Sequence, residues 1–463
     1  MCKRAFLALF VVISSFITIK DLSAQEAIYT AGVAAIDMDP PIGIPLAGYG
    51  SKRRRAPHLD WRNRHPHAFF FTPTTGFRDR LRSKAMVIHD SKGGRLVFVS
   101  VDLIGVSNRL YKDLARKLKK FGYKKDQIFV SATHTHSGPG TLSMNIGLAA
   151  IATDLYKKEN YKHVFGKIYQ SVLTAINKIE RVDLFTSQFD AKKVQYNKWR
   201  KTRREWYNPT AKFILARSKE SGEWLGGMLN FAMHGNAMPL EDTRYSGDVP
   251  GAIERATERK IALLNDSLAA PPTLLFMNGA EGDVRHRGSR GEEVMEQVAE
   301  RFAGQAAESA LIFENMKEVE VGIKVKSGRT FVGIPSYPLE ACVERVGMMR
   351  ALLAIIPDRI PIPLPLFPWS TKLNVAKLGG ITLASWPGEV STALGYELEA
   401  KAKALNKGHD DVWFLGLTND YLTYFTNKSE YKEGEYDSCS SFYGYRGARR
   451  IIKKLTKLMK KID

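Results

Sequence analysis

Short runs of apolar residues alternate with amphipathic segments along almost the whole chain. Runs with the length and composition of strands lie at residues 84–89, 95–101, 128–130, 224–231, 319–326, 378–384 and 412–417. Apolar residues recur with helical spacing at residues 108–121, 293–313, 339–353 and 446–461. Helices interleaved with strands in this way predict an α/β fold with mixed β-sheets flanked by helices. The proline-rich apolar stretch at residues 359–368 excludes a regular helix and predicts a loop or a short linker.

The most informative segment is residues 131–140, Ser-Ala-Thr-His-Thr-His-Ser-Gly-Pro-Gly, which follows a predicted strand. The side chains of residues i and i+2 of a strand lie on the same face of the sheet. We therefore expect His134 and His136 to leave the sheet together, next to a Gly/Pro turn. Two imidazoles placed in this way favour a metal centre or a proton-transfer pair. A single His-x-His pair is structural about as often, so the assignment depends on other motifs.

Three other strand-like runs also end in a turn that carries one candidate ligand. These residues are His234 after residues 224–231, Glu389 after residues 378–384, and Tyr424 after residues 412–417. Catalytic residues commonly lie where scaffold strands give way to loops. Together with His134, these residues predict a zinc site with several protein ligands plus water. The alternative is four separate strand ends with satisfied polar side chains, and it is disfavoured because the same design occurs four times.

From about residue 29 to residue 450, the chain resembles the catalytic domain of the neutral (non-lysosomal) ceramidase family. The resemblance rests on motifs at residues 31–37, 48–49, 96–102, 134–140, 233–235, 246–248, 282–284, 386–389 and 419–424. It implies a single large domain of neutral-ceramidase type that hydrolyses the N-acyl bond of ceramide. It also implies a zinc cofactor and a set of site residues. These are the zinc ligands His134, His234, Glu389 and Tyr424, the proton-transfer residue His136, and the active-site residue Tyr436.

Two positions depart from the pattern of that family, and both bear on the substrate. The family has a serine close to the position of Gly279, and it has a substrate-contacting arginine at the position of Lys198. Lysine is a point charge rather than a planar fork, so this exchange is not conservative. Two alternatives to a ceramidase therefore stay open. One is an esterase or deacylase acting on a more polar or anionic substrate, and the other is a non-catalytic metal-binding relative.

Elementary chemistry supports hydrolysis at such a site. Bound zinc lowers the pKa of its water to about 7, which provides hydroxide for attack on an amide or ester carbonyl. Tyr436 or Lys198 beside the metal would stabilise the oxyanion, and His136 would return a proton to the leaving amine. These three are the candidate catalytic residues. Cysteine catalysis is disfavoured because neither Cys342 nor Cys439 has a histidine close in the sequence.

The first 24 residues predict a signal peptide. Two basic residues precede an apolar run at residues 5–19, and Ala24 is a small residue near a suitable cleavage position. The run is short for a membrane span, so an uncleaved anchor is the less favoured alternative. We expect an extracytoplasmic (periplasmic or secreted) protein. Its residues 25–463 would form one catalytic domain, without the immunoglobulin-like domain that follows it in the family. Cys342 and Cys439 remain in this region, but their spacing does not determine whether they pair.

The formal net charge is +21, from 69 Lys and Arg against 48 Asp and Glu. This charge favours an anionic membrane surface or an acidic substrate. Nucleic acid is not expected as a partner, because no recognised nucleic-acid motif accompanies the charge. The basic stretch at residues 51–65 is interpreted as a solvated loop, with binding of an acidic substrate as the alternative. The helix at residues 446–461 is interpreted as packing its apolar stripe on the domain, with an interfacial membrane helix as the alternative.

Overall fold

The computed structural model describes residues 28–51, 53–55, 67–199, 204–264, 271–342, 359–363 and 366–462. The predicted signal peptide at residues 1–24 lies outside these described residues. So do most of the basic stretch at residues 51–65 and most of the helix expected at residues 339–353. The assignment of residues 25–463 to one domain stays a prediction.

The larger of the two main sheets has nine strands and is mixed, as predicted. In spatial order they are β11 (Thr273–Asn278), β9 (Trp224–Phe231), β8 (Thr210–Ser218), β6 (Glu180–Asp190), β1 (Tyr29–Asp37), β3 (Arg82–Asp90), β4 (Arg95–Val101) and β5 (Ile128–Ala132), with β13 (Lys317–Glu318) beside β6. Two neighbouring pairs, β4–β5 and β9–β11, are parallel. A parallel pair needs a crossover connection, and helices α1 (Asn108–Leu118) and α4 (Asp248–Leu264) lie in these two crossovers.

The smaller sheet packs face to face on the larger one. Its four strands are β14 (Ile323–Phe331), β17 (Ser370–Leu378), β18 (Ile381–Ser385) and β20 (Asp411–Leu415), in this spatial order. One buried apolar cluster contains Phe98 and Met277 from the larger sheet and Leu383 and Trp413 from the smaller sheet. Large apolar side chains removed from water on both sides stabilise this sheet-on-sheet interface.

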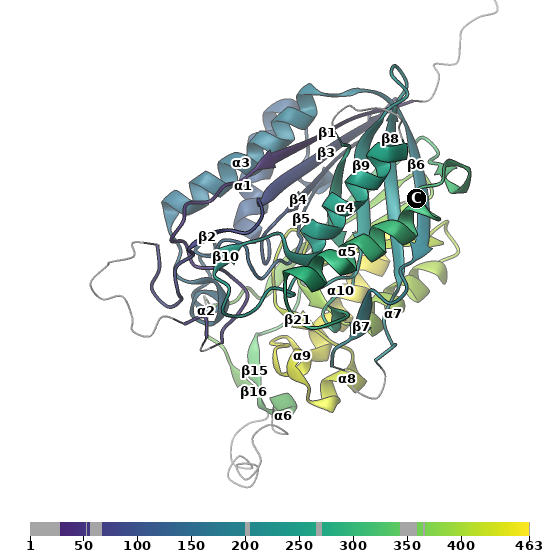
Figure 1. Ribbon diagram of the computed structural model, residues 1–463. Coiled ribbons are helices and arrows are strands. Elements are labelled where there is room, and N and C mark those ends of the chain that lie inside the picture. Colours follow the sequence, from purple (N-terminus) through teal and green to yellow (C-terminus); the bar gives the residue numbers. More distant parts are fainter. Residues whose placement is uncertain are drawn as a thin grey trace, which may run out of the picture.

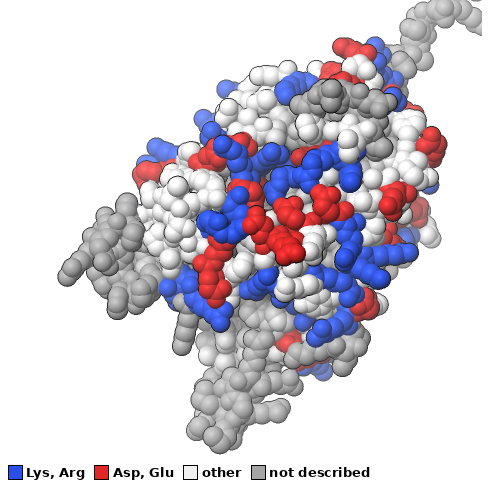
Figure 2. Space-filling model, viewed as in Figure 1, with Lys and Arg blue, Asp and Glu red and all other residues white. Residues whose placement is uncertain are grey.

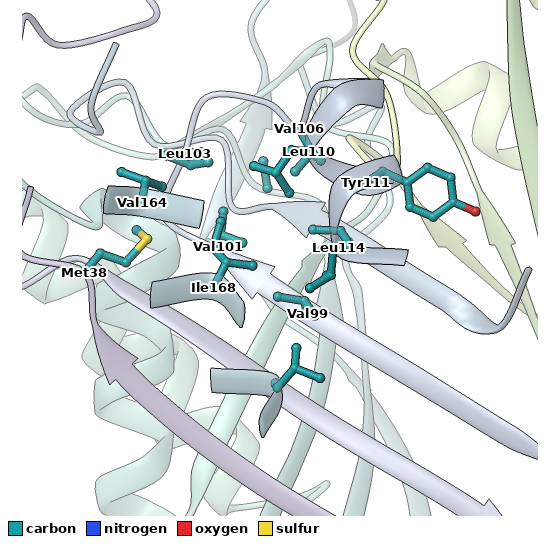
Figure 3. Close-up of a cluster of buried hydrophobic side chains, with 14 of the residues drawn as sticks. Met38, Val99, Val101, Leu103, Val106, Leu110, Tyr111, Leu114, Val164 and Ile168 are labelled. Atoms are coloured by element: carbon teal, nitrogen blue, oxygen red, sulfur yellow. The ribbon is translucent and has the colours of Figure 1, made fainter. Parts of the chain in front are cut away.

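Helices cover the outer faces of both sheets (Figure 1). The larger sheet is covered by α1 and α3 (Lys158–Asn177) over β1, β3 and β4, and by α4 and α5 (Glu292–Ala307) over β9 and β11. The smaller sheet is covered by α7 (Thr392–Lys403) and α10 (Gly444–Met459). Figure 3 shows one of these interfaces, where Val99 and Val101 of β4 lie against Leu110 of α1 and Ile168 of α3. The result is a layered α/β protein in the order helices, sheet, sheet, helices.

Short elements occupy the connections between the layers. They are β2 (Gly76–Phe77), β7 (Gln195–Asn197), β10 (Arg244–Tyr245), β12 (Val284–His286), β15 (Ser336–Pro338), β16 (Arg359–Pro361), β19 (Glu389–Val390), β21 (Tyr424–Phe425), α2 (Ile146–Leu148), α6 (Leu339–Cys342), α8 (Lys428–Glu433) and α9 (Tyr436–Cys439). A disulfide bond between Cys342 and Cys439 joins α6 to α9, so the two cysteines whose pairing the spacing left open do pair. Among the described residues, no helix combines the length and the apolar character that a membrane crossing requires.

Several predicted elements are confirmed at their predicted positions. The strands β4 and β9 occupy residues 95–101 and 224–231, and α1 begins at Asn108 as expected. The C-terminal helix α10 buries its apolar stripe, which includes Ile451, Leu455 and Met459, against the smaller sheet. The interpretation of this helix as packed on the domain is therefore confirmed, and its alternative as an interfacial membrane helix is wrong.

Two expected elements have different bounds. The helix expected at residues 293–313 ends at Ala307, because the chain turns there and the Leu311 amide donates a hydrogen bond to the Ala306 carbonyl. The strand expected at residues 319–326 also begins later. Val319 still donates to the Leu184 carbonyl at the edge of the larger sheet, whereas β14 in the smaller sheet starts at Ile323. The apolar run spans a change of sheet that its hydrophobic pattern does not reveal.

The run at residues 378–384 is not one strand but the tip of a hairpin. β17 ends at Leu378 and β18 starts at Ile381, with Gly379 between them at a φ of 56°. Glycine adopts this left-handed conformation at little cost, so the Gly-Gly pair turns the chain within an otherwise apolar stretch. The proline-rich stretch contributes the short strand β16 and forms no regular helix among its described residues, as predicted.

Charges of both signs lie interspersed on the face formed by α4 and α5 (Figure 2). Two ion pairs connect these helices, Arg255 with Glu296 at 3.6 Å and Arg259 with Glu300 at 2.5 Å. The positive excess of the chain therefore does not form a single-sign patch on this face.

Candidate metal centre and active site

The strand ends singled out in the sequence converge in one buried place. His134 and His136 follow β5, and His234 follows β9. An isolated bridge between Thr135 and Gly235 joins these two segments. Glu389 and Tyr424 belong to β19 and β21, which pair with each other. The structure thus brings together the four predicted zinc ligands and His136, all of them buried.

His134 presents its outer ring nitrogen to Glu389. The Nδ1 of His134 lies 2.7 Å from the carbonyl oxygen of Ile104, so Nδ1 carries the proton and donates it. The Nε2 of a neutral ring is then an acceptor, and it lies 3.1 Å from Oε2 of Glu389. The expectation that His134 and His136 leave the sheet on one face of an extended strand was wrong. Strand β5 ends at Ala132, and His134 has a φ of 67° instead of an extended backbone.

His136 and His234 face each other on the next side of the site. Their Nε2 atoms are 3.1 Å apart, and the His136 ring lies 5.0 Å from the His134 ring. Burial, followed by the nearby positive groups, lowers the pKa of both His136 and His234 well below the usual value. Both imidazoles are therefore neutral near pH 7, which is the form that binds metals and accepts protons.

Two buried carboxylates lie beside these histidines. Burial alone would raise the pKa of Glu389, but His134 and hydrogen bonds from Tyr421 and Tyr424 hold it below its usual value. The Tyr421 hydroxyl donates to Oε1 of Glu389 at 2.6 Å. Glu281 is the second carboxylate, and burial and the charge of Glu389 raise its pKa well above the usual value.

The donor set of this site fits a divalent metal ion. His134 Nε2 and Glu389 Oε2 are both buried acceptors without a hydrogen-bond partner, although they lie 3.1 Å apart. Two acceptors stabilise each other only through a cation or proton between them. Two ligands at about 2.0–2.1 Å from one tetrahedral ion are separated by about 3.3 Å, close to this distance. Ligand atoms of His134, His136 and His234, and those of His134, Glu281 and Glu389, lie within 4.8 Å of one another.

The other two predicted catalytic residues lie at the edge of this centre. The Tyr436 ring lies 5.6 Å from the Tyr424 ring and stacks on Trp199 at 5.1 Å. The Nζ of Lys198 lies 4.5 Å from the centre of the Trp199 ring. Burial lowers the pKa of Lys198 to about 8. Both residues are thus placed around the centre, while their catalytic roles stay predictions.

Glu281 and Tyr421 are site residues that the sequence reasoning missed. Glu281 directly precedes the motif at residues 282–284, and Tyr421 lies inside the motif at residues 419–424. The available signal for Glu281 was its place after a strand, β11, like that of the other site residues. For Tyr421 the signal was a second tyrosine three positions before Tyr424.

Positive side chains surround the His136 side of the site. The Tyr49 ring lies 4.4 Å from the His136 ring, with the guanidinium carbons of Arg54 and Arg290 at 5.1 and 5.3 Å from the Tyr49 ring centre. The Nε of Arg285 is buried without a hydrogen-bond partner. Among the described residues, no carboxylate forms an ion pair with Arg285, Arg290 or Lys198. This side of the site therefore carries positive side chains that form no direct ion pair with a described carboxylate.

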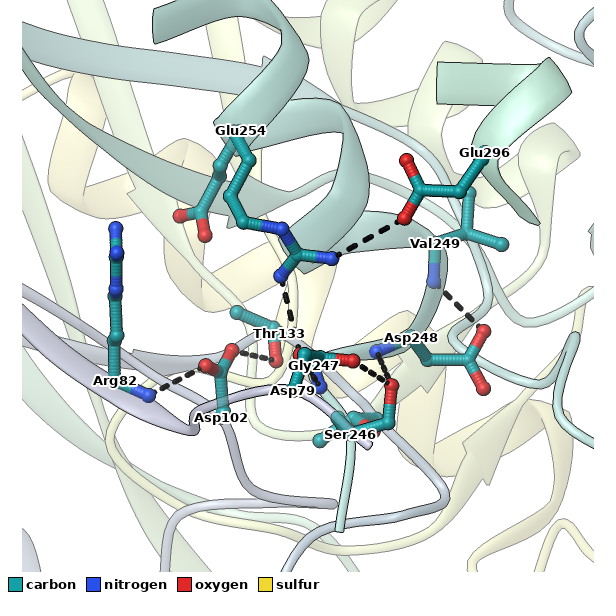
Figure 4. Close-up of polar contacts among 12 residues, drawn as sticks. Asp79, Arg82, Asp102, Thr133, Ser246, Gly247, Asp248, Val249, Glu254 and Glu296 are labelled. Atoms are coloured by element: carbon teal, nitrogen blue, oxygen red, sulfur yellow. Dashed lines mark hydrogen bonds and ion pairs between the residues drawn. The ribbon is translucent and has the colours of Figure 1, made fainter. Parts of the chain in front are cut away.

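A polar network holds the histidine-bearing loops in place (Figure 4). The Ser246 carbonyl accepts a hydrogen bond from Thr135 Oγ1 at 2.6 Å, next to both strand-end histidines of the β5 segment. Asp248 accepts hydrogen bonds from the amides of Ala237 and Met238 at 2.8 and 3.1 Å, just after His234. The motif at residues 246–248 thus holds the loops that carry the site histidines.

Asp102 and Asp79 complete this network. Asp102 accepts hydrogen bonds from the Arg82 amide at 2.7 Å and from Thr133 Oγ1 at 3.0 Å, which anchors the residue before His134. Asp79 accepts a hydrogen bond from Ser246 Oγ at 2.5 Å. Because these carboxylates accept several bonds each, they fix the backbone around the centre before any ligand arrives.

An apolar pocket of about 420 Å³ opens beside the centre. Its walls include Leu103, Ile104, Leu142, Leu148, Phe367 and Tyr421. Two of these residues touch the centre, because the Ile104 carbonyl accepts from His134 and the Tyr421 hydroxyl donates to Glu389. A pocket of this size and composition suits the hydrocarbon part of a small molecule.

Comparison with known proteins identifies the relatives of this chain. Residues 67–287 match the family model described as neutral/alkaline non-lysosomal ceramidase, N-terminal. The chain is 22% identical over 448 residues to the neutral ceramidase of Pseudomonas aeruginosa, covering 80% of this chain and 65% of that protein. It is 21% identical over 489 residues to neutral ceramidase B of Dictyostelium discoideum, covering 84% and 68%. The chain thus spans about two thirds of the length of these relatives.

The fold is shared with a solved relative. The crystal structure of neutral ceramidase from Pseudomonas aeruginosa matches with a TM-score of 0.77 at 17% identity, over 94% of this chain and 74% of that chain. A ceramidase complexed with C2 gives the same TM-score.

The fold and the buried histidine–carboxylate cluster define a layered α/β protein with a candidate metal centre at its strand ends. The chain is similar in sequence and in fold to the neutral/alkaline non-lysosomal ceramidases, so the resemblance that the motifs predicted is confirmed. The predicted fold class is confirmed as well.

Proposed function

We propose that this protein is a zinc-dependent amidohydrolase that cleaves the N-acyl bond of a ceramide-like substrate. One observation carries the proposal: His134 Nε2 and Glu389 Oε2 are unpaired acceptors 3.1 Å apart, at the edge of an apolar pocket. The names of the relatives support the same class of reaction. His134, His234, Glu389 and Tyr424 would hold the ion, and imidazole and carboxylate ligands suit zinc.

The ion would supply a bound water with a pKa near 7 and would polarise the acyl carbonyl. The rest of the mechanism depends on residues of the chain. The Ile104 carbonyl keeps the proton of His134 on Nδ1, so that Nε2 stays a ligand. The hydrogen bond from Tyr421 orients Glu389 in the same way. Both contacts come from the wall of the apolar pocket, which couples acyl-chain binding to the position of the ligands.

His136 would transfer a proton to the leaving amine. Its neutral, buried ring can take up a proton and release it within the site, where water has little access. Lys198 and Tyr436, which flank Trp199, would stabilise negative charge on the carbonyl oxygen. The apolar pocket would hold the acyl chain.

A second candidate substrate is an N-acyl or O-acyl compound with an anionic group. The observation that favours it is the group of positive side chains near His136, namely Lys198, Arg54 and Arg290. A charged group of the substrate would neutralise these side chains in a partly buried place, where such a contact is stronger than in water. The net charge of the chain also favours approach to an anionic membrane surface.

We also propose an extracytoplasmic location. The disulfide bond between Cys342 and Cys439 supports it, because such bonds persist mainly in oxidising compartments.

Metal analysis combined with a substrate panel tests the proposed function. The purified protein would be assayed for bound zinc and for hydrolysis of long-chain ceramide, an N-acyl amino acid and an anionic acyl ester at fixed salt. Hydrolysis of an amide that requires zinc supports the proposal, and a preference for the anionic amide selects the second candidate. A zinc-loaded protein that cleaves none of these compounds would instead be a non-catalytic metal-binding relative.

A further inference from the structure

The carboxylate of Glu281 has no hydrogen-bond partner, although the side chain is completely buried. Its exposed fraction is 0%, and neither carboxylate oxygen has a hydrogen-bond partner. Asp283, two residues later, is the opposite case. One of its oxygens accepts from the amide and the hydroxyl of Thr392, both at 2.8 Å, and the other from Asn197 Nδ2 at 2.8 Å. An ionised carboxylate buried without hydrogen-bond partners is costly, so Glu281 must be neutralised by a proton or by a cation.

The backbone of its loop points this carboxylate at the candidate metal centre. The Gly279 amide donates to the Phe231 carbonyl at 3.0 Å, next to the segment that carries His234. The Gly282 amide donates to the Val390 carbonyl at 2.8 Å, next to Glu389. A Cβ atom at Gly282 would lie 2.9 Å from the Val390 nitrogen, so glycine permits this close approach. Glu281 is therefore held between the two segments that supply candidate ligands.

The surrounding side chains do not neutralise Glu281. Ligand atoms of His134, Glu281 and Glu389 lie within 4.8 Å of one another, so two carboxylates share the site. Lys198 is the positive side chain that acts on Glu281, but the two form no ion pair. Unlike Glu389, Glu281 receives no hydrogen bond from a tyrosine. Two carboxylates this close share a site stably only when a proton or a metal ion neutralises one of the two charges.

We propose that Glu281 is an additional carboxylate ligand of the same metal ion. This inference rests on the proposed function, in which His134, His234, Glu389 and Tyr424 hold that ion. A second carboxylate adds an oxygen ligand and a negative charge to the set. It therefore raises the affinity for the ion and favours more than four protein ligands.

Metal titration of wild type and Glu281→Gln, both prepared metal-free, tests this role. Glutamine has nearly the same volume but no charge, so the packing is kept. We expect the Kd for Zn²⁺, measured by competition with a chelator, to rise at least about 10- to 100-fold. The visible spectrum of the Co²⁺ form should also change, because it reports the number and type of ligands. The thermal midpoint of the metal-free protein should stay the same or rise, since glutamine is uncharged and resembles the protonated carboxyl in shape.

The outcomes separate this inference from the proposed function. Wild type that binds no Zn²⁺ would contradict the proposed function itself. The second outcome is that wild type binds Zn²⁺ tightly and Glu281→Gln has the same affinity and the same Co²⁺ spectrum. This outcome would overturn the role of Glu281 and leave the proposed function intact. Should Glu281→Gln fail to fold, Glu281→Asp carries the test. It keeps the charge but withdraws the carboxylate by one methylene, and an unchanged Kd in that variant would count against a ligand.

Discussion

Glu389 and Tyr424 lie directly opposite each other in the parallel ladder of β19 and β21. The Glu389 amide donates to the Thr423 carbonyl at 3.0 Å, which fixes the register of the two strands. A Cβ atom at Gly388 would lie 2.3 Å from that same carbonyl oxygen, so only glycine allows the strands to approach this closely. Two candidate ligands from segments 35 positions apart thus come together through backbone pairing, which explains the glycine of the Pro-Gly-Glu motif.

His234→Ala should remove most of the bound metal. The imidazole is buried among His134, His136 and the carboxylates, and alanine leaves both a missing ligand and a cavity. Zinc content per chain after dialysis against metal-free buffer is the measurement. His163→Ala is the control, because His163 lies on α3 and contacts backbone carbonyls of residues 38 and 39 instead. A full equivalent of zinc in His234→Ala would show that this residue is not a ligand.

His136→Ala should keep the metal and lose turnover. Because His136 transfers a proton in the proposed mechanism, its removal should lower kcat by roughly 10²–10⁴-fold, with little change in zinc content. The measurement is kcat on the best amide of the panel, beside metal analysis of the same sample. His136 Nε2 lies 3.1 Å from His234 Nε2, close enough for both rings to bind the same ion. The zinc content of the variant therefore distinguishes a proton-transfer residue from a ligand. Loss of zinc in this variant would make His136 a ligand instead.

Asp420 should make the metal-free protein less stable as the pH rises from about 4 to about 6. Burial raises the pKa of this carboxyl from 3.8 to about 6, against hydrogen bonds from Thr371 and the Tyr421 amide. Its folded pKa is above its unfolded pKa, so its stabilising contribution is complete below pH 4. That contribution is lost as the pH rises through 6, by about 3 kcal/mol in total.

Urea unfolding at several pH values measures this effect. Asp420→Asn resembles the protonated carboxyl, so its free energy of unfolding should lack this component of the pH dependence. The comparison is made with chelator present, because protonation of metal ligands would otherwise add to the signal. Parallel curves for wild type and Asp420→Asn would contradict the assignment.

Reduction of the Cys342–Cys439 disulfide should lower both stability and activity. The bond closes a loop with a sequence separation of 97 residues, and loss of such a bond costs about 2–5 kcal/mol. It anchors α9, whose first residue, Tyr436, contacts Tyr424 beside the centre. The double variant Cys342→Ser, Cys439→Ser should therefore have a lower Tm than wild type. It should also have a lower kcat at temperatures where the variant stays folded. Equal Tm values with and without reductant in wild type would contradict this role.

The sequence alone was sufficient for the fold class and for the ends of several strands. Hydrophobic periodicity and turn residues are local properties, so β4, β9 and α10 were predicted close to their observed positions. His134, His136, His234, Glu389 and Tyr424 were chosen because each follows a strand-like run and matches one family motif. That these residues lie in one buried cluster agrees with that choice, while their role as ligands stays a prediction.

Only the tertiary structure decided what depends on contacts between distant segments. The change of sheet at residues 319–323 and the hairpin at Gly379 leave no mark on the hydrophobic pattern, because both sides of each turn are apolar. The pairing of Cys342 with Cys439 likewise depends on how α6 packs against α9. Glu281 shows the limit most clearly. A glutamate in a Gly-rich loop reads as a solvated residue, and its burial without a side-chain hydrogen bond follows from the segments around His234 and Glu389 that enclose it.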